Sequence, residues 1–177
     1  MTEPAGCISL AQEALRKTLG DSATFRTWVG GAADRAAAME HIFHEGLPEP
    51  DGEADAFEQQ ELVAQRPFVI VWTAETEGLV KDVEAGGDRF YFGDGGKLLM
   101  RLEQNAADNQ PASTANLQFK NTIGQIMDEL AAMAGLSGNG DYLAFKRIAL
   151  AEGPFWTPPG AVEAQGLWQA AVLRVEW

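Results

Sequence analysis

The segment from residue 66 to residue 177 most constrains the fold, because its apolar residues recur with two different periods. Residues 68–73 form a short, continuous apolar run, as in a strand buried on both faces. Residues 97–103 alternate between apolar and polar side chains, which is the period of a half-buried strand. Between residues 114 and 134 the apolar residues step by three or four, as in an amphipathic helix. The segment therefore predicts a sheet and a long helix that share one core.

The long helix has recognisable ends. Ser113 or Thr114 is expected to cap its start, and Gly135 to end it. Its predicted buried stripe consists of Phe119, Ile123, Ile126, Leu130 and Met133.

Further strands are predicted on both sides of this helix. Residues 89–92 and 97–103 flank a glycine-rich turn, which favours a hairpin. Residues 142–152 read as a strand that ends at Gly153-Pro154, before a loop that holds Phe155 and Trp156. The closing strand has Arg174 and Glu176 on one face. Its other face carries Ala171, Leu173, Val175 and Trp177.

The first third of the chain is expected to be helical. An apolar stripe within residues 8–19 predicts the first helix, with Gly20 as its stop. Ser22 is placed to cap a second, short helix, and Asp34 a third over residues 35–44. Helices followed by strands around one helix indicate an α+β fold: a mostly antiparallel sheet of four to five strands, with helices packed on one face. We expect a single domain over residues 1–177, with an acidic Pro/Gly loop at 47–56.

The net negative charge of the chain argues against some classes of binding partner. The 26 acidic residues outnumber the 13 basic ones and give a net charge of −13, so a broad nucleic-acid-binding face is not expected. With Cys7 as the one cysteine, no internal disulfide forms, which suits a reducing compartment. We also expect no membrane span and no signal peptide.

The sequence offers little catalytic chemistry. His41 and His44 would share one face of the predicted third helix, so they are the candidate metal ligands, but a zinc site needs a third and usually a fourth ligand. Residues 93–97 lack the spacing and the following helix of a phosphate-binding loop. No Gly-x-Ser-x-Gly motif is present. We therefore expect no enzyme activity, no metal and no cofactor.

Two aromatic clusters are more informative, because aromatic side chains concentrate binding energy at protein interfaces. Both lie beside glycine- or proline-rich segments, which favours at least partial exposure, although at least two of the five aromatic side chains are expected to pack in the core. The candidate interface residues are Arg89, Phe90, Tyr91, Phe92, Phe155 and Trp156.

Several features recur together in one known family. An amphipathic helix at residues 8–19 precedes an Arg66-Pro67 opening to an apolar strand, and a glycine-bounded strand follows at 96–103. A long helix after Thr114 leads to a closing strand with the pattern Trp-x-Ala-x-Val-x-Arg-Val over residues 168–175. This order of elements, which covers most of the chain but contains no diagnostic motif, resembles the tail-terminator and neck proteins of tailed bacteriophages. Those small subunits cap a tail tube and join it to the head.

The resemblance implies a structural virion component, assembled in the bacterial cytoplasm. It implies a sheet backed by helices and a ring of identical subunits, commonly a hexamer. Such a ring docks onto tail-tube and neck proteins and lets DNA pass through its lumen without specific binding. The net charge of −13 suits such a lumen and would equally suit a solvated monomer.

Two alternatives remain open. One is another virion part, such as a head-completion or minor tail protein. The other, from a different class, is a small cytoplasmic ligand-binding domain or enzyme. A deep pocket that gathers His41, His44 and acidic residues would support the second alternative.

Overall fold

The computed structural model describes residues 7–45, 65–73, 96–106, 112–134, 143, 145–156 and 168–176. Five strands form one sheet in the order β1-β2-β3-β5-β4. The short strand β1 (Ile42–His44) runs parallel to β2 (Phe68–Thr73), and every other neighbouring pair is antiparallel. The other strands are β3 (Lys97–Asn105), β4 (Arg147–Trp156) and β5 (Trp168–Glu176).

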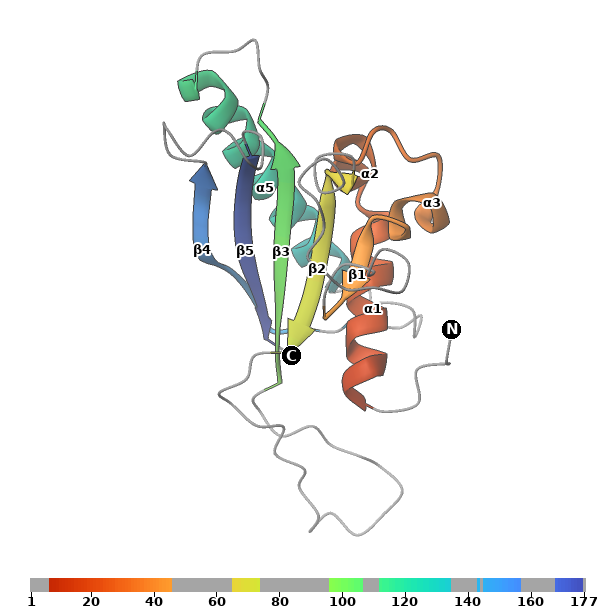
Figure 1. Cartoon of the computed structure of the whole chain (residues 1–177). Coiled ribbons are helices and arrows are strands. Elements are labelled where there is room, and N and C mark those ends of the chain that lie inside the picture. The colour runs from red at the N-terminus through yellow and green to blue at the C-terminus, as the bar shows by residue number, and fades with distance from the viewer. Residues whose placement is uncertain are drawn as a thin grey trace, which may run out of the picture.

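The helices are α1 (Cys7–Asp21), α2 (Ala23–Trp28), α3 (Arg35–Met39) and α5 (Ala112–Ala134). They pack on one face of the sheet; in Figure 1, α5 lies behind the strands and α1 lies beside β1. The predicted α+β class, with a mostly antiparallel sheet and helices on one face, is confirmed.

The strand register explains the single core. Ile42, Val69 and Leu102 stand side by side on β1, β2 and β3, and Ala171 of β5 completes this row. All four side chains are buried, because the alternation of each strand turns them toward the helices. The helices contribute Leu15, Leu19, Phe25, Phe119, Ile123, Ile126 and Leu130 to the same cluster. Burying each such side chain contributes about 1.5–3 kcal/mol, so this core supplies most of the stability.

The helix caps follow the sequence. The Ser22 hydroxyl accepts a hydrogen bond from the Phe25 amide at 2.9 Å, and an Asp34 carboxylate oxygen accepts one from Ala37 at 2.9 Å. Gly20 lies inside α1 and does not stop it. A β-carbon there would approach Met39 and Arg35 of α3 to within 3.0–3.2 Å, so Gly20 allows the close packing of these two helices.

Glu129 of α5 holds the start of α2. Its carboxylate accepts hydrogen bonds from the Ser22 hydroxyl at 2.7 Å and from the amide and hydroxyl of Thr24. Burial by itself would raise the pKa of Glu129. The bonds from Thr24 and Ser22 outweigh this effect and leave the pKa below its ordinary value, because they favour the charged carboxylate.

A charged cluster lies on the sheet face opposite the helices. Glu103 contacts Arg66 at 2.6 Å and Arg101 at 2.7 Å. The Arg101 guanidinium also lies 5.6 Å from the centre of the Trp168 ring. The two arginines therefore compensate for the burial of the Glu103 carboxylate.

Four boundaries differ from those predicted. The third helix ends at Met39, and residues 42–44 form β1 because Val69 and its neighbours on β2 offer backbone partners. The long helix begins at Ala112, so Ser113 and Thr114 lie in its first turn. Strand β4 begins only at Arg147 and continues to Trp156, through the predicted loop.

The predicted hairpin partner of β3 is wrong. Strand β3 pairs with β2 on one side and with β5 on the other, so residues 97–103 have no free edge for residues 89–92. The acidic loop at 47–56, the segment 89–92 and Trp177 lie outside the described residues.

Candidate assembly interface

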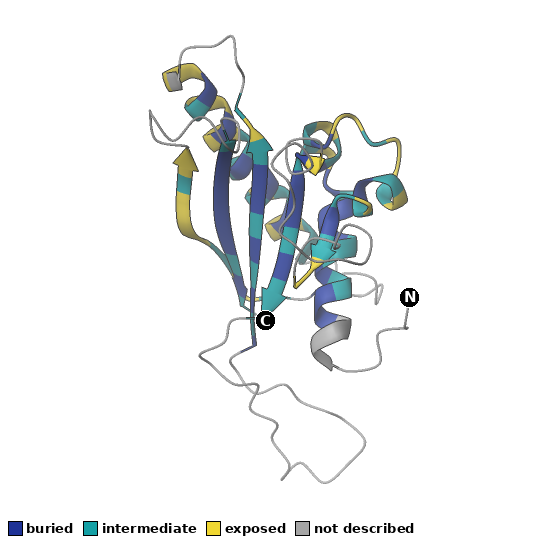
Figure 2. Cartoon of the chain, in the orientation of Figure 1, coloured by how far each residue is buried: buried dark blue, intermediate teal, exposed yellow. Residues whose placement is uncertain are grey.

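Strand β4 forms one edge of the sheet. It pairs with β5 on one side, and no strand of the described part of the chain pairs with its other side. Much of β4 is exposed, whereas β5 beside it is mostly buried (Figure 2). An exposed edge strand offers unpaired N–H and C=O groups to a further strand, so β4 is suited to pairing with another chain.

Exposed apolar side chains are concentrated at this edge. Among the described residues, the large apolar side chains that are exposed are Leu117 (59%), Leu150 (44%), Phe155 (44%) and Trp156 (49%). Three of them belong to β4, and Leu117 belongs to α5, which packs against β4. We call these four residues the β4 patch. Single exposed apolar residues are ordinary, but three on one open edge strand lie where an added strand would cover them.

Gly153 provides the backbone conformation at an irregular point near the end of β4. Its φ is +86°, a conformation that favours glycine, and a β-carbon there would lie 3.0 Å from the Ala170 carbonyl oxygen. The register of β4 against β5 shifts between Glu152 and Phe155, as at a β-bulge. This irregularity lets the strand continue to Trp156.

Phe155 and Trp156 point to opposite faces of the sheet, as successive strand residues do. Phe155 lies opposite Ala170, and Trp156 lies opposite Gln169. The Gln169 amide donates a hydrogen bond to Asn116 of α5 at 2.6 Å, so Trp156 is on the helix-covered face. The two aromatic side chains of the β4 patch therefore lie on opposite faces of the sheet edge.

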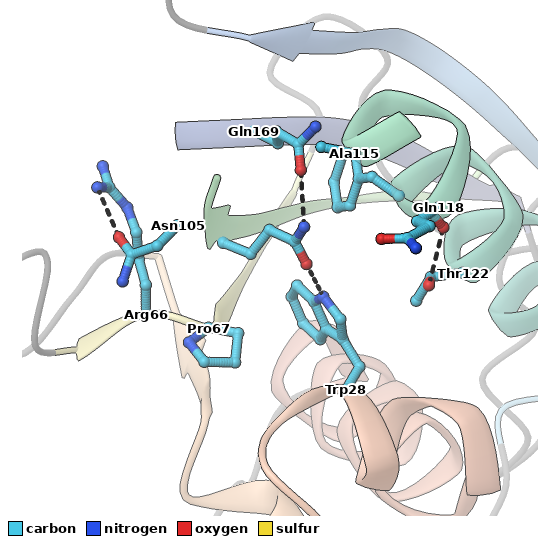
Figure 3. A pocket seen from close by; sticks show the side chains of 10 residues that line it. Trp28, Arg66, Pro67, Asn105, Ala115, Gln118, Thr122 and Gln169 are labelled. Atoms are coloured by element: carbon cyan, nitrogen blue, oxygen red, sulfur yellow. Dashed lines mark hydrogen bonds between the residues drawn. The ribbon is translucent and has the colours of Figure 1, made fainter. Parts of the chain in front are cut away.

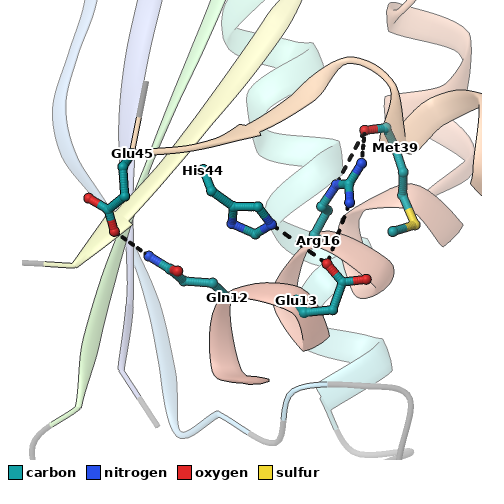
Figure 4. Close-up of polar contacts among 6 residues, drawn as sticks. All are labelled: Gln12, Glu13, Arg16, Met39, His44 and Glu45. Carbon is teal, nitrogen blue, oxygen red and sulfur yellow. Dashed lines mark hydrogen bonds and ion pairs between the residues drawn. The ribbon is translucent and has the colours of Figure 1, made fainter. Parts of the chain in front are cut away.

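The opposite edge is built differently. Strand β1 has three residues, and side chains of α1 hold the chain around it (Figure 4). Gln12 donates to the Glu45 carboxylate at 2.5 Å, and Glu13 lies 3.6 Å from the His44 ring. Arg16 donates to the Met39 carbonyl at 2.7 Å. The edge at β1 is therefore short, and α1 contacts the chain on both sides of this strand.

The structure describes only two of the six predicted interface residues. Phe155 and Trp156 are exposed as expected, but on a strand instead of a loop. Arg89, Phe90, Tyr91 and Phe92 lie outside the described residues, so their role stays a prediction.

The two histidines are not on a common helix, which corrects the geometry assumed for a metal site. His41 lies 2.9 Å from the Pro67 carbonyl oxygen, and His44 belongs to β1 and faces Glu13. Within the described residues, no group of three or more His, Cys, Asp or Glu side chains could hold a metal ion.

Sequence reasoning missed Leu117 and Leu150. Leu117 does carry a signal, because it falls outside the stripe of apolar residues that marks the buried face of α5. Leu150 carries none, since it alternates correctly for a buried strand residue and is exposed only because β4 is an edge strand.

The described scaffold is almost uncharged overall. Ten of the 26 acidic residues and eleven of the 13 basic residues lie in its segments, so residues elsewhere in the sequence carry all of the net negative charge.

No protein-family model matches this chain, and no curated protein has a significantly similar sequence. None of the described helices is long and apolar enough to cross a membrane.

Proposed function

We propose that this protein is a structural assembly subunit that binds a neighbouring copy of itself through the β4 patch. The observation that carries the proposal is the concentration of exposed large apolar side chains on one open sheet edge. Phe155 and Trp156 supply the aromatic anchors, and the edge of β4 supplies backbone hydrogen bonds.

The assembly that we propose is a ring. A ring joins two different surfaces of each subunit, so the β4 patch binds a second, distinct surface of the next copy. Pairing of β4 with another β4 would instead close a dimer. The net charge of −13 suits a lumen past which DNA moves without adhering.

Together with the order of elements, these properties favour the role of a tail-terminator or neck subunit of a tailed phage. In that role the ring caps the tail tube, contacts neck proteins and becomes part of the virion. The same edge would also serve a head-completion or minor tail protein, which remains the alternative within this class.

Native mass spectrometry over a wide concentration range, with negative-stain images of the most concentrated sample, tests the ring. We expect closed rings with a central hole. A species no larger than a dimer at every concentration would contradict the ring, and a strict monomer would contradict self-assembly through β4.

A further inference from the structure

A groove separate from the β4 patch runs between α2 and α5. Two hollows, of about 310 and 330 Å³, adjoin the Trp28 side chain. Trp28 and Thr122 line both hollows, so the two form neighbouring parts of one groove. Each has a volume at the lower end of the range for small-molecule sites.

The described lining of the groove mixes uncharged polar side chains with apolar ones such as Trp28, Pro67 and Phe119. Among the described residues that line it there is no Asp or Glu, although the chain has 26 acidic residues. The charged side chain in this described lining is Arg66, which is buried and bound to the Glu103 carboxylate at 2.6 Å. Amide and hydroxyl groups come from Thr24, Thr27, Gln104, Asn105, Gln118, Thr122, Gln125 and Gln169.

Hydrogen bonds fix the wall of the first hollow (Figure 3). The Trp28 indole N–H donates to the Gln104 side-chain oxygen, and the Gln104 amide donates to Gln169 at 2.7 Å. Gln169 donates in turn to Asn116 at 2.6 Å. The chain of bonds connects α2, β3, β5 and α5, so the Trp28 ring and the amides are held in place before any ligand arrives.

Two other amides are available to a ligand. Gln118 and Gln125 are exposed, and within the described part of the chain their side chains have no hydrogen-bond partner. Gln118, Thr122 and Gln125 have the spacing of one helix face. Gln118 lines the first hollow, and Gln125 lines the second. The Thr122 hydroxyl donates to the Gln118 backbone carbonyl at 3.1 Å, which leaves its oxygen free to accept.

We infer that this groove binds a neutral saccharide of about two ring units, one unit on each side of Trp28. Sugar hydroxyls both donate and accept hydrogen bonds, as do the amides of Gln118 and Gln125. The Trp28 ring offers an apolar surface for the C–H faces of the sugar. A phosphorylated ligand fits less well, because the one cation in the lining is already paired with Glu103. An apolar ligand would cover the amides of Gln118 and Gln125 without giving them hydrogen-bond partners.

Saturation-transfer NMR with four neutral disaccharides tests the inference: maltose, cellobiose, lactose and N,N′-diacetylchitobiose. We expect at least one to bind with millimolar affinity and to change the fluorescence of Trp28. Gln118→Ala should weaken that binding about threefold to tenfold, the effect of losing one hydrogen bond. Asn121→Ala is the matched control, since Asn121 is an exposed amide on the same helix outside both linings. It should bind like the wild type.

Absence of binding by all four sugars at high millimolar concentration would overturn the inference. So would binding that Gln118→Ala and Gln125→Ala both leave unchanged. Neither result bears on the ring, because neither residue belongs to the β4 patch.

Discussion

The two edge strands of the sheet differ in how far they are open to pairing with another chain. Both β1 and β4 have one side without a strand partner in the described residues. At β1 the strand has three residues, and contacts from Gln12, Glu13 and Arg16 of α1 hold the adjoining chain. At β4 the strand has ten residues and carries exposed leucine, phenylalanine and tryptophan. Proteins commonly shorten or cover an edge strand to avoid unwanted pairing, so a long edge strand with exposed apolar side chains favours binding to another chain.

The contrast separates stability from assembly. Contacts at β1 are internal to the subunit, so changes there should alter the free energy of unfolding. The four side chains of the β4 patch are exposed, so changes there should alter association and leave the subunit folded.

The largest change in stability is expected from a substitution in the buried face of α5, which we compare with the same substitution on its exposed face. Ile126 is fully buried in the core, and Ile126→Asp should destabilise the protein by about 3–5 kcal/mol, because it buries an unpaired charge. Leu117→Asp places the same charge on the exposed side of this helix and should change stability by no more than about 0.5 kcal/mol while abolishing assembly. Urea unfolding and native mass spectrometry measure the two effects. Normal melting of Ile126→Asp would mean that the buried face of α5 is misassigned.

Removing both aromatic anchors should have the next largest effect. Phe155→Ala with Trp156→Ala should weaken association about a hundredfold, as expected for interface hot spots, without unfolding the subunit. Circular dichroism and analytical ultracentrifugation follow fold and association. Phe43→Ala is the control at the other edge, where the ring packs edge-to-face on Phe68 at 6.5 Å. It should reduce stability and leave association intact; the reverse pattern would place the interface at β1.

Glu129 anchors α5 to α2, away from the β4 patch. Glu129→Gln should lower stability at neutral pH by about 1–2 kcal/mol, because it weakens charge-assisted hydrogen bonds from Ser22 and Thr24. Since the folded-state pKa is lowered, this contribution is present above the ordinary pKa of 4.5 and is lost as the pH falls through the folded value. The difference in unfolding free energy between wild type and variant should therefore shrink below about pH 4.5. A difference that stays constant into strong acid would rule out this role for the carboxylate.

The smallest expected effect is at β1. Gln12→Ala removes the hydrogen bond to Glu45 and should cost about 1 kcal/mol, which lowers the melting temperature by about 2–4 °C. Assembly should be unaffected. Differential scanning calorimetry measures the first effect, and a loss of oligomers at constant melting temperature would contradict the division between the two edges.

Local patterns were enough to predict much of this fold. The Ser22 and Asp34 caps and the α5 stripe depend on neighbours within one turn, and the alternation of β3 depends on its own residues. What failed were pairings between distant segments. The parallel pairing of β1 with β2 and the position of β3 between β2 and β5 depend on contacts that no local pattern encodes.

The candidate interface was predictable only in part. The aromatic pair Phe155 and Trp156 attracts notice in the sequence, but Gly153-Pro154 before it suggested a loop, because a strand that continues through a bulge has no strong local signature. The exposure of Leu150 depends on strand order. The groove beside Trp28 depends on amides from β3, β5 and α5, which meet only in the folded chain.

Hydrogen exchange tests the central claim most directly, with the protein compared at low and high concentration. If the β4 edge is the assembly surface, backbone amides of residues 149–156 gain protection as oligomers form, while those of β1 and α1 do not change. Oligomers that form without added protection in β4 would contradict the account.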